Sequence, residues 1–252
     1  MNDPKHILIT GASSGIGEAL AEGYAGPGIT LQLSGRNEER LESVAEGARA
    51  KGATVHTKVI DVADRDAMAA WIAQADDGLP LDLVIANAGV GLSQKDAPTL
   101  AEIADKTFDI NVHGVFHTVH PALERMVPRR RGQVAINASI AGFVGMPGAA
   151  PYAASKAAVR SYGEGLRGAY HRRNVQVNVI CPGFVVSRMT NQNKFRMPFL
   201  MDTDKAARII MRGLARNKAR IAFPWQTYWS IRLLQMLPVA LADRLLRRSP
   251  TK

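Results

Sequence analysis

The sequence predicts an α/β fold: one doubly wound, parallel, seven-stranded sheet with helices on both faces. Two observations predict it. Short apolar runs alternate with helix-length amphipathic stretches, which is the pattern of strand–helix–strand units joined by right-handed crossovers. Glycines and polar residues directly follow the apolar runs, where the carboxyl ends of parallel strands form the ligand-binding edge of such a sheet.

The size and composition of the chain fit one such domain over residues 1–252. Hydrophobic residues make up 46% of the 252 residues, which is enough for a large core. The one cysteine, Cys181, excludes an internal disulfide and fits a reducing compartment. The sequence begins without the shape of a signal peptide and has no run of about 18 uncharged apolar residues. We therefore expect a cytoplasmic protein.

The expected strands are apolar along their whole length, as in a sheet that helices cover on both sides. They are residues 6–9, 29–33, 55–60, 81–86, 134–137, 175–180 and 221–223. The expected helices are residues 18–24, 38–49, 65–75, 100–126 and 153–170, and residues 225–252 form a C-terminal helical extension.

The loop after the first strand has the composition of a phosphate-binding turn. A glycine at the strand exit permits a tight turn, and a glycine in mid-loop lets the backbone approach a pyrophosphate. A third glycine lets the next helix, with its free N–H groups, pack closely on the sheet. An ordinary glycine-rich turn is the alternative, but the spacing and position favour a dinucleotide. The expected binding residues are Gly11, Ser13, Ser14, Gly15, Ile16 and Gly17.

The end of the second strand indicates which dinucleotide binds. An acidic residue there would bind the ribose 2′-hydroxyl of NAD, but the sequence has Gly35-Arg36 instead. The planar guanidinium of Arg36 suits a 2′-phosphate, so we expect NADP, with NAD as the alternative. The competing interpretation is that Arg36 only caps the next helix or lies in solvent.

Asp61 follows the third strand. Its carboxylate suits the adenine amino group, beside the backbone of Val62. Asp61 as the N-cap of a helix that begins near Asp64 is equally well supported.

A phenol and an ammonium are expected on one helix face, because Tyr152 and Lys156 are four residues apart. A free tyrosine titrates near 10, so its pKa must fall by about two to three units before the phenol works as an acid or base near neutrality. A cation held nearby favours the phenolate.

Two polar residues accompany this pair. Ser139, directly after the fifth strand, is placed to hold a substrate oxygen beside the phenol, unless it only bonds its own backbone. Asn111 lies inside an expected helix, where asparagine is unfavourable. It either holds a water that links Lys156 to solvent or is a surface amide.

Together these residues resemble the short-chain dehydrogenase/reductase family, from about residue 5 to about residue 223. The resemblance implies a Rossmann-type fold and a metal-free alcohol dehydrogenase or carbonyl reductase. It also implies a homodimer or homotetramer built on the two long helices. The motifs that carry it are Thr10-Gly11-x3-Gly15-Ile16-Gly17, Asn87-Ala88-Gly89, Asn111, Ser139, Tyr152-x3-Lys156 and Pro182-Gly183.

The resemblance also implies a role for each residue. Tyr152 is the catalytic acid/base and Ser139 positions the substrate oxygen. Lys156 holds the nicotinamide ribose and lowers the pKa of the phenol, while Asn111 supports a proton relay. Ser187 stands where the family often has threonine, but its hydroxyl still suits the carboxamide. The further cofactor contacts implied are Asn87, Ala88, Gly89, Tyr152, Lys156, Pro182, Gly183, Val185 and Ser187.

The expected function is interconversion of an alcohol and a ketone or aldehyde by hydride transfer with NADP. The alternatives are an NAD-dependent dehydrogenase of the same family and a non-catalytic dinucleotide sensor, against which the presence of Tyr152 and Lys156 argues. A hydrophobic small-molecule substrate is expected because the pocket wall is expected to be apolar. That wall comprises Ile140, Phe143, Val144, Met146, Phe184, Met189, Phe195, Met197 and Phe199.

The net charge of +10 admits other partners. We expect no nucleic acid, because the basic residues are scattered and no aromatic residues interleave with them. We also expect no metal, although His113, His117 and His120 have helical spacing. Residues 225–252 combine aromatics and leucines with arginines. Three alternatives fit them: peripheral contact with an anionic membrane, a cap over the substrate pocket, or a subunit contact.

Overall fold

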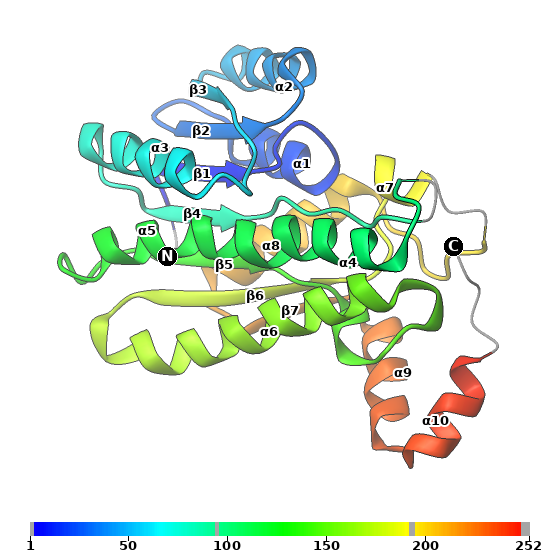
Figure 1. Cartoon of the computed structure of the whole chain (residues 1–252). Coiled ribbons are helices and arrows are strands. Elements are labelled where there is room, and N and C mark those ends of the chain that lie inside the picture. The colour runs from blue at the N-terminus through cyan, green and yellow to red at the C-terminus, as the bar shows by residue number, and fades with distance from the viewer. Residues whose placement is uncertain (1–2, 94–95, 192–194, 248–252) are drawn as a thin grey trace.

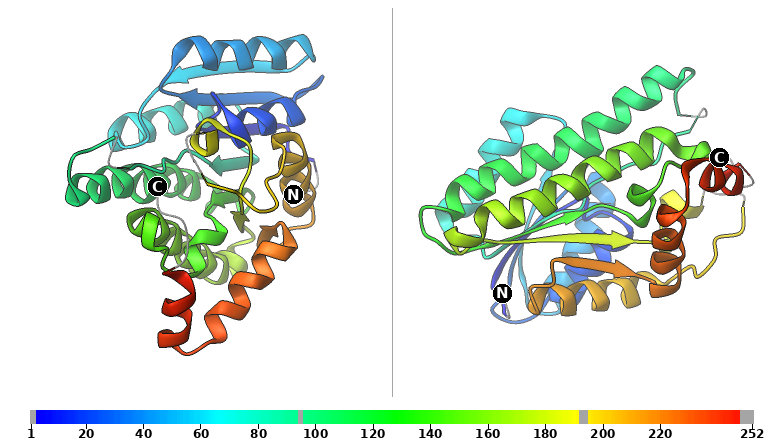
Figure 2. Two further views of the ribbon diagram at one scale, coloured as in Figure 1. Left: turned by 90° about the vertical axis from the view of Figure 1, so that its right-hand side faces the viewer. Right: turned by 90° about the horizontal axis from the view of Figure 1, so that it is seen from below.

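A computed structural model describes residues 3–93, 96–191 and 195–247. Its centre is a seven-stranded sheet in the order β3-β2-β1-β4-β5-β6-β7, with every neighbouring pair parallel (Figure 1). Helices cover both faces of the sheet (Figure 2, right). The predicted fold class is confirmed.

All seven expected strands form, and their ends lie within two residues of the expected ones. Only β3 departs from the expected pattern, because His56, Lys58 and Val59 are exposed. The reason is that β3 lies at the edge of the sheet, where helices cover it less completely. The strands are β1 (His6–Thr10), β2 (Thr30–Gly35), β3 (Thr54–Val59), β4 (Leu83–Ala86), β5 (Gln133–Asn137), β6 (Gln176–Pro182) and β7 (Arg220–Phe223).

Alternate residues of the inner strands enter two separate cores. Ile7 and Ile9 of β1 pack on one side with α1 (Gly15–Tyr24), α2 (Glu38–Ala50) and α8 (Thr203–Ala215). Leu8 packs on the other side, under a second layer of helices. This two-sided burial explains why apolar residues stand on both faces of the inner strands. The second layer consists of α3 (Arg65–Gly78), α5 (Gly114–Met126) and α6 (Ala150–Tyr170).

Helix α8 is not among the expected helices. Its buried residues Ala206, Ala207, Ile210 and Leu214 recur at helical spacing, and this is the signal that predicts it. Because α8 packs against α1, it helps to hold the glycine-rich loop at the start of α1 in place.

The expected long helix at 100–126 is interrupted. Helix α4 (Leu100–Phe108) passes into a π-helical turn (Asp109–His113) before α5 begins. Such turns insert one extra residue into a helix and are frequent at functional sites. Asn111 lies in this turn and is fully buried.

The C-terminal extension consists of α9 (Trp225–Met236) and α10 (Val239–Leu246), which project from the sheet at the lower right of Figure 1. Residues 248–252 of the expected extension lie outside the described residues. Helix α9 packs on the core through Tyr228 and Ile231. No helix in the described part of the chain is both long and apolar enough to cross a membrane.

Candidate active site

A cleft of about 1000 Å³ opens at the carboxyl edge of the sheet. The loops after β1 to β6 line it, on both sides of the point between β1 and β4 where the strand order reverses. Its volume is at the upper end of the range of about 300–1,000 Å³ that is usual for ligand pockets, so a large ligand fits. All the expected site residues line the cleft except Gly17 and Asn111, which lie behind its wall.

The glycine-rich loop has the conformation that its sequence predicts. Gly11 and Gly15 have φ angles of +66° and +61°, in the region that favours glycine. A Cβ on Gly17 would lie 2.3 Å from the carbonyl oxygen of Gly11, so only glycine lets α1 pack this close to the loop. The N-cap residue Ser14 makes no capping hydrogen bond through its side chain. This cradle of backbone at a helix N-terminus fits a dinucleotide pyrophosphate.

Asn87 fixes the ends of three strands relative to one another. Its Nδ2 donates to the carbonyl oxygens of Thr10 (3.0 Å) and Gly11 (3.2 Å), and its Oδ1 accepts from Asn137 (2.8 Å). The hydroxyl of Thr10 accepts from the backbone N–H groups of Asn87 and Ala88. Sequence reasoning included Thr10 in the glycine-rich motif without giving it a role of its own, and it gave no role to Asn137.

Arg36 and Asp61 lie beside each other in the lining of the cleft, after the neighbouring strands β2 and β3, and form an ion pair at 3.7 Å. Arg36 does not cap α2, because the side chain of Asn37 accepts from Arg40 N–H and does so instead. Likewise Asp64 caps α3, so the interpretation of Asp61 as the N-cap is wrong. Asp61 accepts from the backbone N–H of Ala63 instead. A second cation, Arg40, also lines the cleft and was missed because it lies inside the helix.

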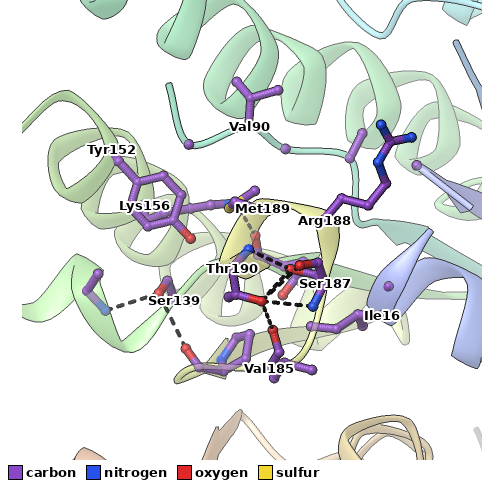
Figure 3. A pocket seen from close by; sticks show the side chains of 18 of the residues that line it. Ile16, Val90, Ser139, Tyr152, Lys156, Val185, Ser187, Arg188, Met189 and Thr190 are labelled. Carbon is purple, nitrogen blue, oxygen red and sulfur yellow. Dashed lines mark hydrogen bonds between the residues drawn. The ribbon is translucent and has the colours of Figure 1, made fainter. Parts of the chain in front are cut away.

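Tyr152 and Lys156 lie on one face of α6, as their spacing predicts (Figure 3). The Lys156 Nζ is 5.9 Å from the centroid of the Tyr152 ring and donates to the Asn137 carbonyl at 2.8 Å. The phenol oxygen of Tyr152 points toward Ser139 (Figure 3). The Ser139 hydroxyl also accepts from Ala141 N–H, so it both begins the 3-10 turn at Ile140–Phe143 and faces the cleft.

Burial dominates the electrostatics of this pair. It raises the pKa of Tyr152, and the hydrogen bond with Ser139 only partly opposes that rise. Burial also lowers the pKa of Lys156 to about 8. The expectation that Lys156 lowers the pKa of the phenol stays a prediction, because in the chain alone burial is the largest influence on the Tyr152 pKa and raises it.

Asn111 joins two walls of the site. Its Oδ1 accepts from Val90 N–H (2.8 Å), while its Nδ2 donates to the Val90 carbonyl (2.9 Å) and to Ser155 Oγ (3.0 Å). Because Asn111 is 0% exposed, its interpretation as a surface amide is wrong. The Asn111 Oδ1 and the Lys156 Nζ each lie 3.1 Å from where a Cβ on Gly89 would stand, so a side chain there would crowd both groups.

The loop after β6 holds itself in shape through hydroxyl groups. Thr190 Oγ1 donates to the Val185 carbonyl (2.9 Å) and accepts from Ser187 N–H (2.8 Å), as Figure 3 shows. Sequence reasoning missed Thr190, which lies in the short helix α7 (Arg188–Asn191). The loop places Ser187 opposite the glycine-rich loop, with its Cβ 3.2 Å from where a Cβ on Gly15 would stand, and both residues line the cleft.

The apolar wall differs from the expected one. Five of the nine expected residues line the cleft: Ile140, Met146, Phe184, Met189 and Phe195. The others, Phe143, Val144, Met197 and Phe199, do not line it.

Phe143 and Phe199 do not line the cleft for opposite reasons. Phe143 is buried under α9, and Phe199 is 55% exposed. Thr227 and Ile231 of α9 take part in the wall and were not expected. Of the three alternatives for the C-terminal segment, this lining favours a cap over the pocket.

The three histidines each have a protein partner. His113 pairs with Asp109 at 3.2 Å, His117 with the Val62 carbonyl at 3.0 Å, and His120 with the Tyr162 hydroxyl at 2.6 Å. Within residues 3–93, 96–191 and 195–247, no cluster of three or more histidine, cysteine or acidic residues suits a metal ion.

Comparison with known proteins agrees with this architecture. Residues 5–197 match the model of the short chain dehydrogenases. An uncharacterized oxidoreductase of Myxococcus xanthus is 39% identical over 242 residues, which is 96% of each chain. The gluconate 5-dehydrogenase of Gluconobacter oxydans is 37% identical over 190 residues, which is 73% of each chain.

Solved structures agree as well. A short-chain dehydrogenase/reductase from Burkholderia phymatum, in complex with NAD, superposes with a TM-score of 0.83 at 25% identity, over 100% of this chain and 98% of that one. A short-chain dehydrogenase from Sphingobium yanoikuyae, in complex with NADPH, has a TM-score of 0.80 at 23% identity, over 97% and 96%. The chain is therefore an oxidoreductase of the short-chain dehydrogenase/reductase family.

Proposed function

We propose that the protein reduces a hydrophobic ketone or aldehyde to an alcohol with NADPH, with Tyr152 as the general acid. The observation that carries this proposal is the meeting of a phenol, a hydroxyl and an ammonium in one wall of the cleft. Tyr152 and Ser139 face each other there, and Lys156 lies beside the ring. The apolar wall formed by residues such as Ile140, Phe184 and Ile231 supports a hydrophobic substrate.

A nicotinamide in this cleft supplies the hydride, and its oxidised form adds a positive charge that favours the phenolate. The residues of the chain manage the proton. The hydroxyl of Ser139 holds the carbonyl oxygen, and the phenol of Tyr152 donates its proton to that oxygen as negative charge develops there. In the oxidation direction Tyr152 accepts the proton from the alcohol. Lys156 binds the ribose, and Asn111 keeps the Val90 segment against α6 and supports the proton relay.

The preference for NADP is supported by Arg36 and Arg40, two guanidinium groups that line the cleft next to the end of β2. Asp61, 3.7 Å from Arg36, supports the NAD alternative, because a carboxylate there opposes a 2′-phosphate. One structural relative has bound NADPH and another NAD, so the relatives favour neither. Because Arg36 and Arg40 together outweigh the single charge of Asp61, the site favours NADP. Cells usually keep this cofactor in its reduced form, NADPH, which favours the reduction of a carbonyl compound.

Initial rates with a panel of hydrophobic carbonyl compounds, with NADPH or NADH, test the proposal. We expect a higher kcat/KM with NADPH. Arg36→Ala should lower kcat/KM for NADPH about 10- to 100-fold and leave NADH almost unchanged, because a charge-assisted hydrogen bond contributes about 1.5–3 kcal/mol. Arg173→Ala, which removes an exposed cation outside the cleft, is the control. A higher kcat/KM with NADH, or NADPH binding without turnover, would contradict the proposal.

We further propose a homodimer or homotetramer that uses the outer faces of α4, α5 and α6. Helices α5 and α6 run side by side along one side of the molecule (Figure 2, right). Phe116 of α5 packs on Tyr162 of α6, with ring centroids 4.7 Å apart, and both are only partly buried. A partly exposed aromatic surface of this kind suits a subunit contact. The mass in solution by light scattering tests this.

A cytoplasmic location, the remaining expectation, is supported by Cys181. This single cysteine is buried, and burial raises its pKa to about 12. A neutral, inaccessible thiol forms no disulfide, which suits a reducing compartment.

A further inference from the structure

The C-terminal helices carry an exposed apolar surface, which we call the outer face. Four of its side chains, Trp225, Trp229, Leu233 and Met236, recur at helical spacing and form one stripe along α9. Three more, Val239, Leu241 and Leu245, continue it on α10. The described residues have six other large exposed apolar side chains, of which Phe199 and Leu200 are adjacent and Val186 lies on the segment paired with them. With seven members on two consecutive helices, the outer face is the main concentration.

The opposite face of α9 is firmly attached to the core. Tyr228 and Ile231 pack there, and Gln235 Nε2 donates to the carbonyl oxygen of Phe143. The Phe143 ring also lies under the guanidinium group of Arg232, with 5.8 Å between the guanidinium carbon and the ring centroid. This attachment fixes the rotation of α9, so the apolar stripe stays outward. A helix that is apolar on both faces is normally covered on both.

Two arginines of the core strengthen the attachment. The guanidinium carbons of Arg160 and Arg220 lie 4.6 Å and 5.1 Å from the Phe143 ring centroid, and Arg220 donates to the Tyr228 hydroxyl at 3.0 Å. Glu164 pairs with both arginines. Phe143 ends the 3-10 turn that begins at Ser139, so α9 is packed directly on the segment that carries the proposed substrate-positioning hydroxyl.

The charge of the C-terminal helices indicates which kind of partner binds the outer face. The described part of the extension, residues 225–247, has three basic residues, Arg232, Arg244 and Arg247. Its one acidic residue, Asp243, pairs with Arg247 at 2.7 Å, so the net charge of this part is +2. A two-fold contact with a second copy would bring two such basic segments together, because a two-fold interface uses the same patch on both subunits. An anionic lipid surface neutralises them instead. Tryptophans, leucines and arginines on exposed helices are the composition of interfacial membrane binding.

The same helix forms a wall of the cleft, through Thr227 and Ile231. We propose that α9 and α10 dock by the outer face on an anionic lipid surface, so that the cleft takes an apolar carbonyl compound from the membrane. The docking surface stands on its own observations, and the delivery of substrate rests on the function proposed above.

Flotation of the full-length protein with vesicles tests the docking. Vesicles of phosphatidylcholine alone are compared with vesicles that contain phosphatidylglycerol, at low and high salt. We expect flotation with the anionic vesicles at low salt, reduced at least 10-fold by high salt or by omission of the anionic lipid. Recovery of the protein only in the soluble fraction with anionic vesicles at low salt would overturn the proposal.

Two variants identify the surface. Trp229→Glu/Leu233→Glu should abolish flotation and leave kcat for a water-soluble carbonyl compound unchanged, because neither side chain lines the cleft. Met236→Ser/Val239→Ser, at positions 81% and 85% exposed, is a milder variant that keeps the test valid if the first fails to fold. Leu79→Glu, at an apolar position 46% exposed at the end of α3, away from both proposed contact surfaces, is the control and should float normally. Flotation of both double variants at the wild-type level would overturn the assignment.

Two further measurements separate the alternatives. If a second copy covers the outer face, light scattering will show a smaller assembly for the double variants and the wild type will not float, which overturns the proposal. If the proposed delivery is correct, anionic vesicles raise kcat/KM for a membrane-partitioned ketone several-fold in the wild type and not in the double variants. Flotation without any NADPH-dependent turnover would leave the docking intact and refute the proposed function.

Discussion

The two sides of the cleft are built differently. On the side that fits the cofactor, the contacts come from residues directly after strands, such as Gly11, Arg36 and Asn87, held by the backbone and by buried hydrogen bonds. On the side that fits the substrate, the wall combines the turn at Ile140–Phe143, the loop after β6 and the distant helix α9.

This difference separates the chemistry of the enzyme from its specificity. The chemical groups depend on short spacings along one helix or one loop, so substitution on that side should affect turnover with every substrate. The apolar wall depends on three segments that only tertiary packing brings together, so substitution there should change which substrate is preferred. Variants on each side therefore test whether the two sides are as independent as their construction indicates.

The largest effect is expected on the chemical side. Tyr152→Phe removes only the hydroxyl of a partly buried ring, so the cleft should keep its shape and its affinity for NADPH. Its kcat should fall by about 10²- to 10⁴-fold with every carbonyl compound, because a positioned general acid contributes that much. Steady-state rates and NADPH fluorescence titration measure the two quantities.

Tyr170→Phe is the matched control, since it removes a phenol hydroxyl from the same helix, at its far end. It should keep normal turnover. A Tyr152→Phe enzyme with near-normal kcat would show that another group moves the proton and would remove the basis for distinguishing a chemical side.

The sequence predicts the chemical side well for a physical reason. A loop of three glycines and a Tyr–Lys pair on one helix are local patterns, and local geometry fixes what they do. Asn111 shows the limit of this reasoning. The predicted regular helix does not say whether the Asn111 side chain is buried or on the surface. In the structure Asn111 lies in the π-helical turn at Asp109–His113 and is buried, and the sequence shows no signal for that turn.

The substrate side was predicted less well because its parts are distant in the sequence. Phe143 is an apolar residue in the loop that was expected to line the cleft. Its ring instead packs under α9 and against three guanidinium groups. Ile231 replaces it, some ninety residues later, and no pattern near the motifs marks it. Periodicity indicates that α9 has apolar faces but not which face meets the cleft.

The second prediction concerns the cost of burying Lys156. Its pKa is about 8 in the folded chain and 10.5 when exposed. Between these values the unfolded chain holds a proton that the folded chain lacks, so the stabilisation of the folded state increases as pH rises. Relative to Lys156→Met, the free energy of unfolding of the wild type should rise by about 3 kcal/mol from pH 8 to 10.5.

Chemical denaturation at several pH values measures this difference. The comparison with Lys156→Met is needed because Cys181 acts in the opposite direction. Its pKa rises from 9.0 to about 12 on folding, so it lowers stability from about pH 9 upward in both proteins. A difference between wild type and variant that does not change with pH would mean that Lys156 keeps its ordinary pKa and that the chemical side is more hydrated than its burial indicates.

The smallest effect is expected on the substrate side. Ile231→Ala enlarges the apolar wall where α9 meets the cleft, so the kcat/KM of a small carbonyl compound relative to a bulky one should change by about 10-fold, as expected when a few methyl and methylene contacts are lost. The NADPH-to-NADH ratio should stay constant, because Ile231 and Arg36 line opposite parts of the cleft. Ser230→Ala, at an exposed neighbouring position on α9, is the control and should change neither ratio. If Ile231→Ala instead lowered kcat equally for all substrates, its main effect would pass through the packing of α9 on the Ser139 turn, and the separation between chemistry and specificity would fail at that contact.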